Sequence, residues 1–501
     1  MRKSAITAFA FTGSLLAAYC FGSTASCVAC AILLLLSVVA LISKHRAAPL
    51  AVALTVAVAF GCAVMHFTVI KADNIENTYS GKSANCIGII EDVKPTESGK
   101  RAYVRIISAD GKDTDFKAVS YFGNKDGISE RRYVVGNFDF FSIDDHEGFP
   151  SRDYYFGKGI SLGAYAYGAV SVDETHGDTA VYYLRDRING VFDRYTGDMS
   201  YLASGIVLGD KDGFSAEWKE KLSQDGISHL FAVSGLHVSI LLGALFFLLE
   251  KLKLSKLLRT VTVCAFALFY MYLVGFTPSV CRAVIMSGCA VMGGIWGRRT
   301  DSITSLAVSA AVLCLISPNG VIDLSFQLSF LATAGVIFAV FYAFRPISES
   351  VSDGFFTKIG LYVYRVTVTS VFAVAFCMPA IAHYFGSVSA MSPIANLICA
   401  PVAELFLLLC FILLAVSFSP LIAGSVGFIT QKAGEVFVFL ADRISASGIM
   451  LDVSHPAVKY ISTALVICAV SAVLFNVKRK RQIVCVCPLL ICVTALAFGL
   501  F

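Results

Sequence analysis

The fold of this chain is indicated by the stretch HLFAVSGLHVSILLGALFFLLE at positions 229–250. Residues 240–249 are apolar throughout, and a membrane-spanning helix needs about 20 predominantly apolar residues to cross a hydrocarbon core about 30 Å thick. The stretch therefore predicts a transmembrane helix. Its first half is unusual because it holds two histidines, a serine and a glycine. Polar groups in lipid must find partners or line a water-filled space.

The whole chain has the composition of a membrane protein. Of its 501 residues, 57% are hydrophobic and 15% are charged, whereas soluble chains average about 45–50% apolar and about 25% charged residues. This composition excludes a water-soluble enzyme, a disordered chain and a coiled coil. Working outward from 229–250, we predict a polytopic α-helical protein with about 11–13 spans, drawn from apolar stretches at 4–22, 25–43, 48–70, 229–250, 257–276, 280–297, 302–317, 321–344, 361–384, 391–418, 421–445, 457–475 and 483–501. Prolines at 393, 401 and 420 could break the region 391–445 into half-helices.

The predicted orientation comes from the lysines and arginines of the short loops, which accumulate on the cytoplasmic side. They occur at Arg2 and Lys3, at 44–46 and in every second short loop after the polar region, and the alternate loops contain none. We therefore predict a multi-pass membrane protein with a cytoplasmic N-terminus. Residues 71–228 and the C-terminus should lie outside the cytoplasm.

The polar stretch 71–228 divides into a β region and a helical region. Turn residues separate five segments that alternate between apolar and polar side chains, namely Ala84–Val93, Ala102–Ser108, Phe116–Phe122, Tyr133–Ile143 and Ile160–Val172. Five short strands suit a small barrel such as an OB-fold, and a generic β-sandwich is the alternative. An apolar stripe from Val181 to Tyr195, with Asp178 as N-cap, then predicts an amphipathic helix, and Ser215–Gln224 predicts a second.

Polar side chains inside the predicted spans are the first candidates for function. Two histidines, Ser234 and Gly235 open the span at 229–250, and Arg282, Gln327 and Asn396 lie in three later spans. A buried arginine is costly and marks a partner, a pore or an anionic substrate. The alternatives are that these polar groups only bond neighbouring helices, that Asn396 marks a structural helix break, and that Arg282 snorkels to the headgroups.

The order of the motifs resembles that of the ComEC family, the membrane channel of bacterial natural competence. The stretch His229–Val238 looks like the signature of that family, and five others match its pattern in order: Asp153–Ile160, Gly205–Lys211, Thr277–Ala283, Asp323–Phe330 and Pro393–Pro401. The resemblance implies a channel for transforming single-stranded DNA in the bacterial cytoplasmic membrane. It implies no catalytic residue, no cofactor and no metal site in this chain.

The resemblance also suggests where the DNA would pass. The candidate translocation path consists of His229, Ser234, Gly235, His237, Arg282, Gln327 and Asn396, and the candidate external mouth consists of Gly209, Asp210 and Lys211. Aromatic residues of the β region, such as Tyr103, Tyr121 and Phe122, could stack bases. The implied partners are single-stranded DNA, the lipid bilayer, a DNA receptor and a cytoplasmic ATP-driven motor. The motor is expected to be a separate chain because this sequence has no nucleotide-binding P-loop. The oligomeric state is not indicated.

Two features depart from the family pattern. Many members continue into a metallo-β-lactamase-like domain, but this sequence has no HxHxDH zinc motif. We therefore expect any nuclease to be a separate chain. Residues 71–228 hold 19 Lys and Arg against 26 Asp and Glu, a net charge of −7, whereas a non-specific DNA receptor should be basic.

The sequence thus predicts four regions and leaves two rival functions. The regions are N-terminal spans at 1–70, an OB-like extracytoplasmic domain at 71–172, an amphipathic helical connector at 173–228 and a competence-type transmembrane channel domain at 229–501. One rival is transport of another polyanion or polymer. The other is an intramembrane hydrolase that uses Ser234 with His229 or His237.

Overall fold

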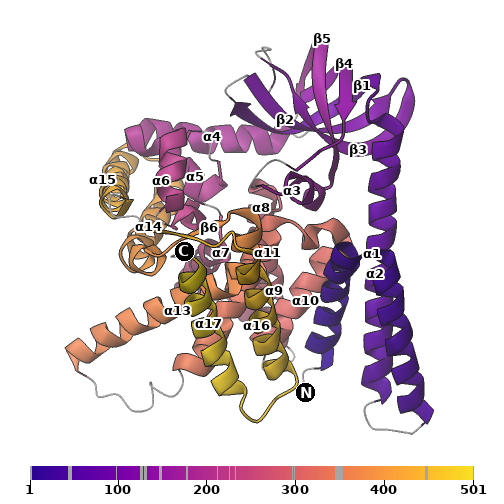
Figure 1. Ribbon diagram of the computed structural model, residues 1–501. Helices are drawn as coiled ribbons and strands as arrows, with labels where there is room; N and C mark the ends of the chain where they lie inside the picture. Colours follow the sequence, from indigo (N-terminus) through magenta and orange to yellow (C-terminus); the bar gives the residue numbers. More distant parts are fainter. Residues whose placement is uncertain are drawn as a thin grey trace. The chain divides into compact units, whose positions relative to one another are not determined.

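The computed structural model describes residues 3–42, 48–96, 99–123, 128, 132–145, 149–176, 179–210, 213–224, 226–231, 233–295, 297, 300–344, 354–445 and 449–499 (Figure 1). The chain forms two compact units, and each is described by itself. The barrel unit comprises Ile6–Tyr183 and Ala310–Leu324, and the bundle unit comprises Met1–Ala5, Leu184–Ser309 and Ser325–Phe501.

Two long helical elements open the barrel unit. Element α1 (Lys3–Ile42) consists of two helices that meet at Gly22, where the backbone is not helical and φ is 76°. This break lies between the predicted spans 4–22 and 25–43. Helix α2 (Ala48–Tyr79) has 32 residues, about 48 Å at 1.5 Å per residue, and extends past the predicted end at residue 70. The ring of Tyr79 lies 5.0 Å from Phe116 and 5.8 Å from Phe140. The end of α2 therefore packs into the β domain that follows it.

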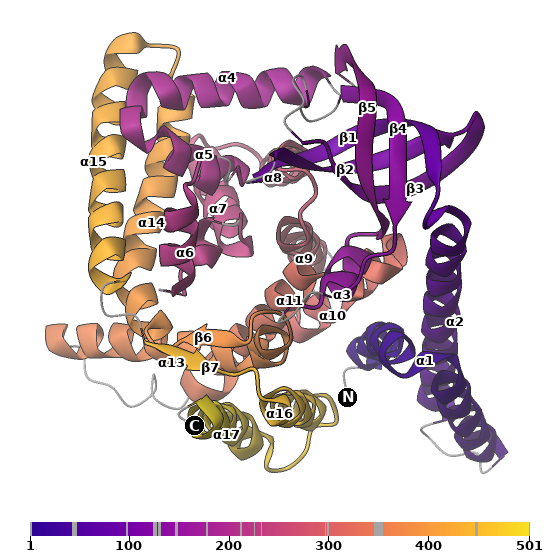
Figure 2. The same ribbon diagram turned by 45° about the horizontal axis from the view of Figure 1, so that its top comes forward.

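The β domain is a closed five-stranded barrel. All five predicted strands are present, as β1 (Ser83–Thr96), β2 (Gly99–Ala109), β3 (Lys112–Tyr121), β4 (Arg132–Phe141) and β5 (Ile160–His176). They pair in the order β1-β2-β3-β5-β4, and β4 closes the barrel on β1 (Figure 2). Only the β3–β5 contact is parallel. A two-sheet sandwich therefore does not describe this region.

Alternation along the strands explains the barrel core. On β2, Ala102, Val104 and Ile106 point inward and are at most 1% exposed, whereas Arg101 and Arg105 point outward. The core residue Phe122 is 1% exposed, so the prediction that it stacks bases is wrong. A short helix that the sequence did not predict, α3 (Ser151–Gly157), connects β4 to β5.

The helical connector covers a hydrophobic core of the bundle unit. Helix α4 (Thr179–Thr196) places the predicted apolar stripe, including the fully buried Phe192, against this core. Helix α6 (Ala216–Gln224) is capped as predicted, since the Ser215 hydroxyl accepts from the Trp218 amide at 3.2 Å. The predicted cap Asp178 lies outside the described residues. A further short helix, α5 (Ser200–Leu208), was not predicted.

The bundle unit consists mainly of apolar helices. Their bounds are α7 (Gly235–Lys251), α8 (Lys256–Leu273), α9 (Pro278–Ile295), α10 (Ser302–Ile316), α11 (Leu324–Phe338), α13 (Phe355–Tyr384), α14 (Ser392–Val416), α15 (Pro420–Ser445), α16 (Pro456–Leu474) and α17 (Lys480–Gly499). Helix α11 continues as a π-helical turn to Phe344, and α10 straddles the boundary between the two units. Figures 1 and 2 show α14 beside α15 and α16 beside α17.

Among the described residues, eight helices are long and apolar enough to cross a membrane. The chain is therefore a polytopic helical membrane protein. The other five predicted spans do not meet that description for separate reasons. Helix α7 has 17 residues, the apolar parts of α9 and α10 are Pro278–Gly293 and Ser302–Ile316, and α15 carries four charged side chains. The second half of α1, after Gly22, is also not among the eight.

Two predictions about helix boundaries need correction. The span at 229–250 does not begin at His229, because a 3₁₀ turn (Ser228–Phe231) precedes α7, which starts at Gly235. Pro401 does not divide the region 391–445, because α14 continues through it from Ser392 to Val416. Pro393 lies in the first turn of α14 and Pro420 begins α15, where a missing backbone N–H costs nothing.

Candidate functional site

The start of α7 is held by a reciprocal cap. The Ser234 hydroxyl accepts from the His237 amide at 3.3 Å, and the His237 ring lies 3.5 Å from the Ser234 amide, which donates to it. Each side chain therefore contacts the other residue's backbone, as in a capping box. His237 is buried at 2% exposure. Its neighbour His229 is exposed on the preceding 3₁₀ turn, with Nδ1 3.0 Å from the Gly226 carbonyl oxygen.

Arg282 is buried beside this helix start. Its side chain is 7% exposed, so the alternative that it snorkels to the headgroups is wrong. Its Nη1 donates to both the backbone carbonyl and the hydroxyl of Ser329 on α11. The Phe330 ring lies 5.8 Å from the guanidinium carbon. No carboxylate pairs with Arg282 among the described residues, so neutral oxygens hold a full positive charge.

Gly235 allows this approach between α7 and α9. A Cβ atom at Gly235 would lie 2.2 Å from Nη2 of Arg282, far inside van der Waals contact. Only glycine leaves room for the guanidinium against the first turn of α7. Since the N-terminal end of a helix carries partial positive charge, Arg282 and the α7 start together make a strongly positive point inside the bundle.

The other predicted path residues lie apart from this point. Gln327 is half-buried on α11, two residues before Ser329, and residues two apart on a helix point about 200° away from each other. On α14, the side-chain amide of Asn396 donates to the Ser370 hydroxyl of α13 at 3.3 Å. The Asn396 amide oxygen is buried and has no hydrogen-bond partner among the described residues.

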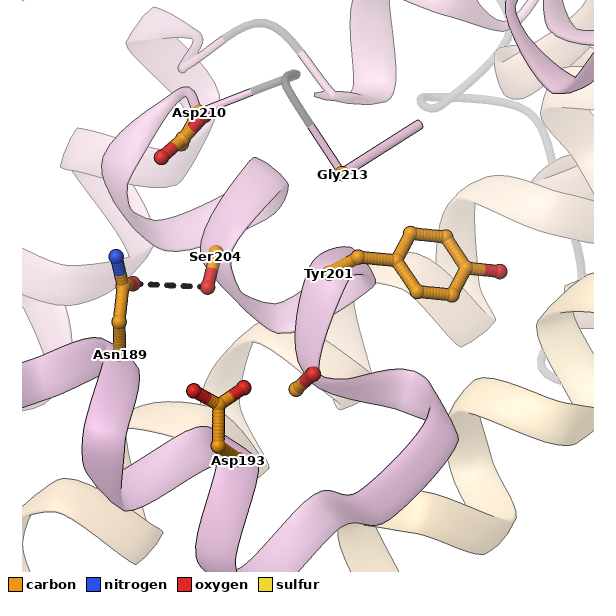
Figure 3. A pocket seen from close by; sticks show the side chains of 7 residues that line it. Asn189, Asp193, Tyr201, Ser204, Asp210 and Gly213 are labelled. Carbon is orange, nitrogen blue, oxygen red and sulfur yellow. Dashed lines mark hydrogen bonds between the residues drawn. The ribbon is translucent and has the colours of Figure 1, made fainter. Parts of the chain in front are cut away.

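The predicted external mouth borders a polar pocket. Gly209 ends α5 in the left-handed conformation, with φ of 75°. Asp210 follows it and lines a pocket with six other residues, Asn189, Asp193, Ser200, Tyr201, Ser204 and Gly213 (Figure 3). Asn189 accepts from the Ser204 hydroxyl at 2.9 Å. Asp193 and Asp210 contribute carboxylates to the lining of this pocket. Lys211 lies outside the described residues.

The motif Asp153–Ile160 covers most of α3, the turn after it and the first residue of β5, and its contacts join three parts of the barrel unit. Tyr19 of α1 donates to Asp153 at 2.6 Å, and Asn319, which precedes α11, donates to the Phe156 carbonyl at 2.9 Å. Lys158 donates to Tyr154 at 2.8 Å and to Tyr103 at 3.3 Å. Burial alone would raise the pKa of Tyr154, but the Lys158 ammonium lowers it below the usual tyrosine value. Tyr103, beneath Lys158, is 7% exposed and offers little surface for stacking.

Sequence reasoning missed the residues that complete the site. Ser329 is the partner of Arg282, and Ser370 is the partner of Asn396. Ser329 was visible as a polar residue in an apolar run. The contact between Ser329 and Arg282 could not be predicted from the sequence, because the two residues are 47 positions apart and only helix packing brings them together.

The comparisons with known proteins point to one family. The sequence model of the family described as "Competence protein" matches residues 206–482, more than half of the chain. This chain belongs to that family. The matched range contains the α7 start, Arg282, Ser329 and Asn396, and it ends in the first turn of the last helix, α17.

A curated relative agrees with this assignment. The chain is 28% identical over 204 residues to ComE operon protein 3 of Bacillus subtilis (strain 168). The alignment covers 41% of this chain and 25% of the relative, so this Competence family member matches only about a quarter of that protein's length. No solved structure matches the chain.

The described residues contain no group of three or more His, Cys, Asp or Glu side chains that could hold a metal ion.

Proposed function

We propose that this Competence family member is a membrane channel that carries transforming single-stranded DNA across the bacterial cytoplasmic membrane. One observation carries the proposal: Arg282, in the region that matches the family, is a buried cation with no carboxylate partner in the part of the chain that the structure describes. A DNA strand carries one phosphate per nucleotide. A buried positive charge on its route would offset the cost of bringing that phosphate into the bundle.

The geometry suggests how such a contact would work. Ser329 binds Arg282 through Nη1, which leaves other guanidinium N–H groups to meet a phosphate. The cap between Ser234 and His237 fixes the first turn of α7, whose N-terminus adds partial positive charge. A single contact of this kind reads no bases, so the strand can bind weakly and move on.

The remaining path residues have supporting roles in this proposal. We place His229, Gln327 and Asn396 along the route as hydrogen-bonding groups, and Gly209, Asp210 and Lys211 at its external mouth. We assign no catalytic step to Ser234, because its contacts with His237 are those of a helix cap. This geometry favours the channel over an intramembrane hydrolase.

The proposed architecture follows the four regions stated above. Spans at 1–70 lead to an extracytoplasmic OB-like domain at 71–172, a helical connector at 173–228 and the channel domain at 229–501. The strand order β1-β2-β3-β5-β4, closed and with a parallel β3–β5 contact, supports the OB-like assignment. The N-terminus would be cytoplasmic and the C-terminus extracytoplasmic. A DNA receptor, a nuclease and an ATP-driven motor would be separate chains.

The test is uptake of labelled DNA into the cytoplasm of cells shown to be competent. Deletion of the gene should abolish uptake, and complementation with Arg282→Ala should fail to restore it while membrane insertion stays normal. Arg365→Ala removes an exposed arginine on α13 and is the matched control, which should restore uptake. Unchanged uptake after deletion would refute the channel, and full activity of Arg282→Ala would refute the role of Arg282.

A further inference from the structure

Three aromatic rings gather on the outer surface of the barrel. Tyr121, Phe141 and Tyr165 come from β3, β4 and β5. The ring of Phe141 lies 4.8 Å from Tyr165 and 6.4 Å from Tyr121, each at an interplanar angle of 27°. The rings of Tyr121 and Tyr165 are 5.4 Å apart. The three rings therefore form one nearly parallel cluster, which we call the aromatic platform.

Strand register and one glycine build this platform. Tyr121 and Tyr165 are direct partners across the parallel β3–β5 pair. Gly163, the partner of Phe141 across β4–β5, leaves room for the Phe141 ring, because a Cβ atom there would lie 2.2 Å from a ring carbon. The Phe141 ring thus lies flat against the backbone of β5. The platform is part of the rigid barrel and not a chance meeting of surface side chains.

The platform is open at one end. Tyr165 is 56% exposed, and Tyr167, two residues along the same outward face of β5, is 42% exposed. A large aromatic ring that is rigidly supported on one side and open on the other offers a flat surface for another ring. Stacking of a nucleic-acid base on such a ring contributes about 1–3 kcal/mol.

The charges around the platform do not suit phosphates. Asp139 is the cross-strand partner of Tyr165. Residues 83–176 hold 11 Lys and Arg against 15 Asp and Glu. Arg101 donates to Tyr155 at 3.2 Å and Lys158 donates to Tyr103 and Tyr154. These neutral hydroxyls leave the two positive charges in place, but carboxylates outnumber cations over residues 83–176. We therefore expect a strand bound here to be held by its bases.

We propose that the aromatic platform of Tyr121, Phe141 and Tyr165 is a binding site for the unpaired bases of single-stranded DNA, and that it binds through stacking and not through phosphate contacts. The choice of DNA as the ligand rests on the proposed function. The inference goes further than that function because it assigns a second site, in the barrel unit, with a different chemistry from the Arg282 site.

This chemistry also fixes an order of events. Paired bases are stacked inside a duplex and cannot lie on a protein ring. A reaction that separates the strands or degrades one of them must therefore act before DNA reaches the platform. The substrate of the barrel is the single-stranded product of that reaction.

The test measures binding by the full-length protein in nanodiscs of zwitterionic lipid. Three fluorescent 30-nucleotide probes are compared by anisotropy: oligo-dT, an abasic strand with the same backbone, and a duplex. Oligo-dT should bind about tenfold or more tightly than the abasic strand or the duplex, as one or two stacked bases would give. Its affinity should change little between 50 and 200 mM salt, unlike that of phosphate-binding proteins.

Two variants at Tyr165 locate the effect. Tyr165→Ala should weaken oligo-dT binding by about tenfold and leave abasic binding unchanged, whereas Tyr165→Phe keeps the ring and should bind like the parent protein. The double variant Arg105→Ala/Asp115→Ala, elsewhere on the barrel surface, is the control and should bind normally. Equal binding of oligo-dT and the abasic strand, or normal oligo-dT binding by Tyr165→Ala, would overturn the proposal.

The experiments distinguish a refutation of the aromatic-platform proposal from a refutation of the channel proposal. If binding does not depend on bases but gene deletion abolishes uptake, the platform is refuted and the channel stands. If binding depends on bases but deletion leaves uptake unchanged, the channel is refuted and the barrel is a single-strand binding domain with another use.

Discussion

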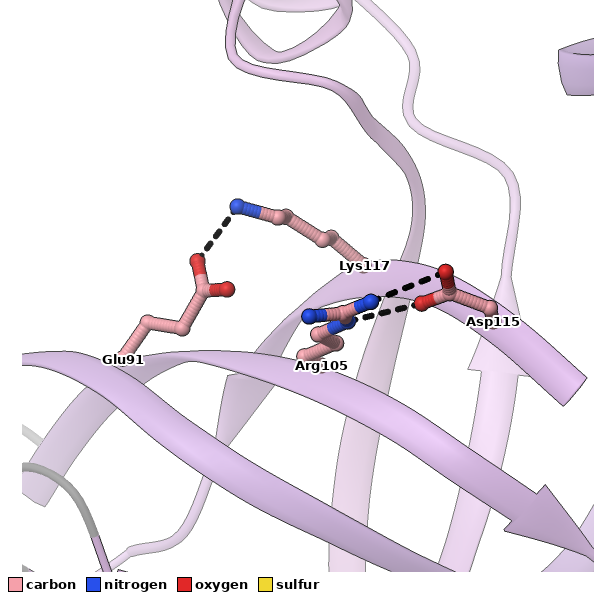
Figure 4. Close-up of polar contacts among 4 residues, drawn as sticks. All are labelled: Glu91, Arg105, Asp115 and Lys117. Atoms are coloured by element: carbon pink, nitrogen blue, oxygen red, sulfur yellow. Dashed lines mark hydrogen bonds and ion pairs between the residues drawn. The ribbon is translucent and has the colours of Figure 1, made fainter. Parts of the chain in front are cut away.

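Two arginines in this protein have opposite surroundings. On the barrel surface, Arg105 donates to both carboxylate oxygens of Asp115, at 2.7 and 2.9 Å, and Lys117 pairs beside it with Glu91 at 2.6 Å (Figure 4). Arg282 in the bundle is 7% exposed and bonded only to the neutral oxygens of Ser329 among the described residues. The exposed arginine is neutralised and the buried one is not.

This difference suggests that the barrel and the bundle would bind DNA through different chemical groups. A charge that is cancelled by a carboxylate attracts phosphate only weakly, and residues 83–176 carry more carboxylates than cations beside their exposed rings. In the bundle, the buried Arg282 has no carboxylate partner among the described residues. We therefore expect the barrel to recognise bases and the bundle to recognise phosphates.

Among substitutions of the residues around Arg282, the largest effect should come from Gly235→Ala. The added Cβ would lie 2.2 Å from Nη2 of Arg282, so the guanidinium must shift, and we expect its contacts with Ser329 to weaken. DNA uptake should fall about tenfold or more, as expected for loss of a charge-assisted contact worth about 1.5–3 kcal/mol. Gly243→Ala is the control on the same helix, because nothing lies within 4 Å of a Cβ there. Equal uptake by both variants would show that the close approach does not matter.

A smaller effect is expected from Ser329→Ala. The variant removes one acceptor of Arg282, the hydroxyl, but keeps the backbone carbonyl. Uptake should fall by about two- to tenfold, corresponding to one hydrogen bond worth about 0.5–1.5 kcal/mol. Ser325→Ala, at an exposed position of α11, should have no effect. A loss as large as that of Gly235→Ala would mean that the hydroxyl alone positions Arg282.

The smallest effect should come from Arg105→Ala/Asp115→Ala. The two side chains are 49% and 63% exposed, and exposed ion pairs contribute only about 0–1 kcal/mol to stability. The hydrogen bond and charge of Arg105 lower the pKa of Asp115. The small contribution of the pair is therefore present at neutral pH and is lost as the pH falls through that lowered pKa. Thermal unfolding should show the small difference from the parent at pH 7, and the difference should shrink as the pH is lowered from 4 to 2. A shift of many degrees at pH 7 would contradict the comparison.

Local patterns in the sequence were enough to predict much of the fold. The period-two alternation of residues 84–172 located all five strands, because one face of each strand fills the barrel core. The apolar stripe of α4 likewise predicted which side chains meet the bundle core. The N-terminal end of α7 at Gly235 was harder to predict. The apolar run begins before the helix does, and the position of the cap depends on where the backbone turns.

The sequence was enough to predict single residues of the site, but not the contacts between them. Ser234, Gly235 and Arg282 stood out as polar or small residues in apolar runs. Their meeting depends on the packing of α7, α9 and α11, which no local pattern encodes. The same limit explains why Tyr103 and Phe122 were wrong candidates for stacking. Sequence alternation alone did not separate the covered and buried aromatic residues from the exposed Tyr165.

The central claim is that an uncancelled positive charge at position 282 serves passage of the DNA strand. The most direct measurement is entry of labelled single-stranded DNA into liposomes that contain the purified protein, with the Arg282→Lys and Arg282→Gln variants compared side by side. Both variants shorten the side chain, but only lysine keeps the charge. The account predicts that Arg282→Lys retains most of the entry and that Arg282→Gln loses it. Equal entry through the two variants would contradict the claim.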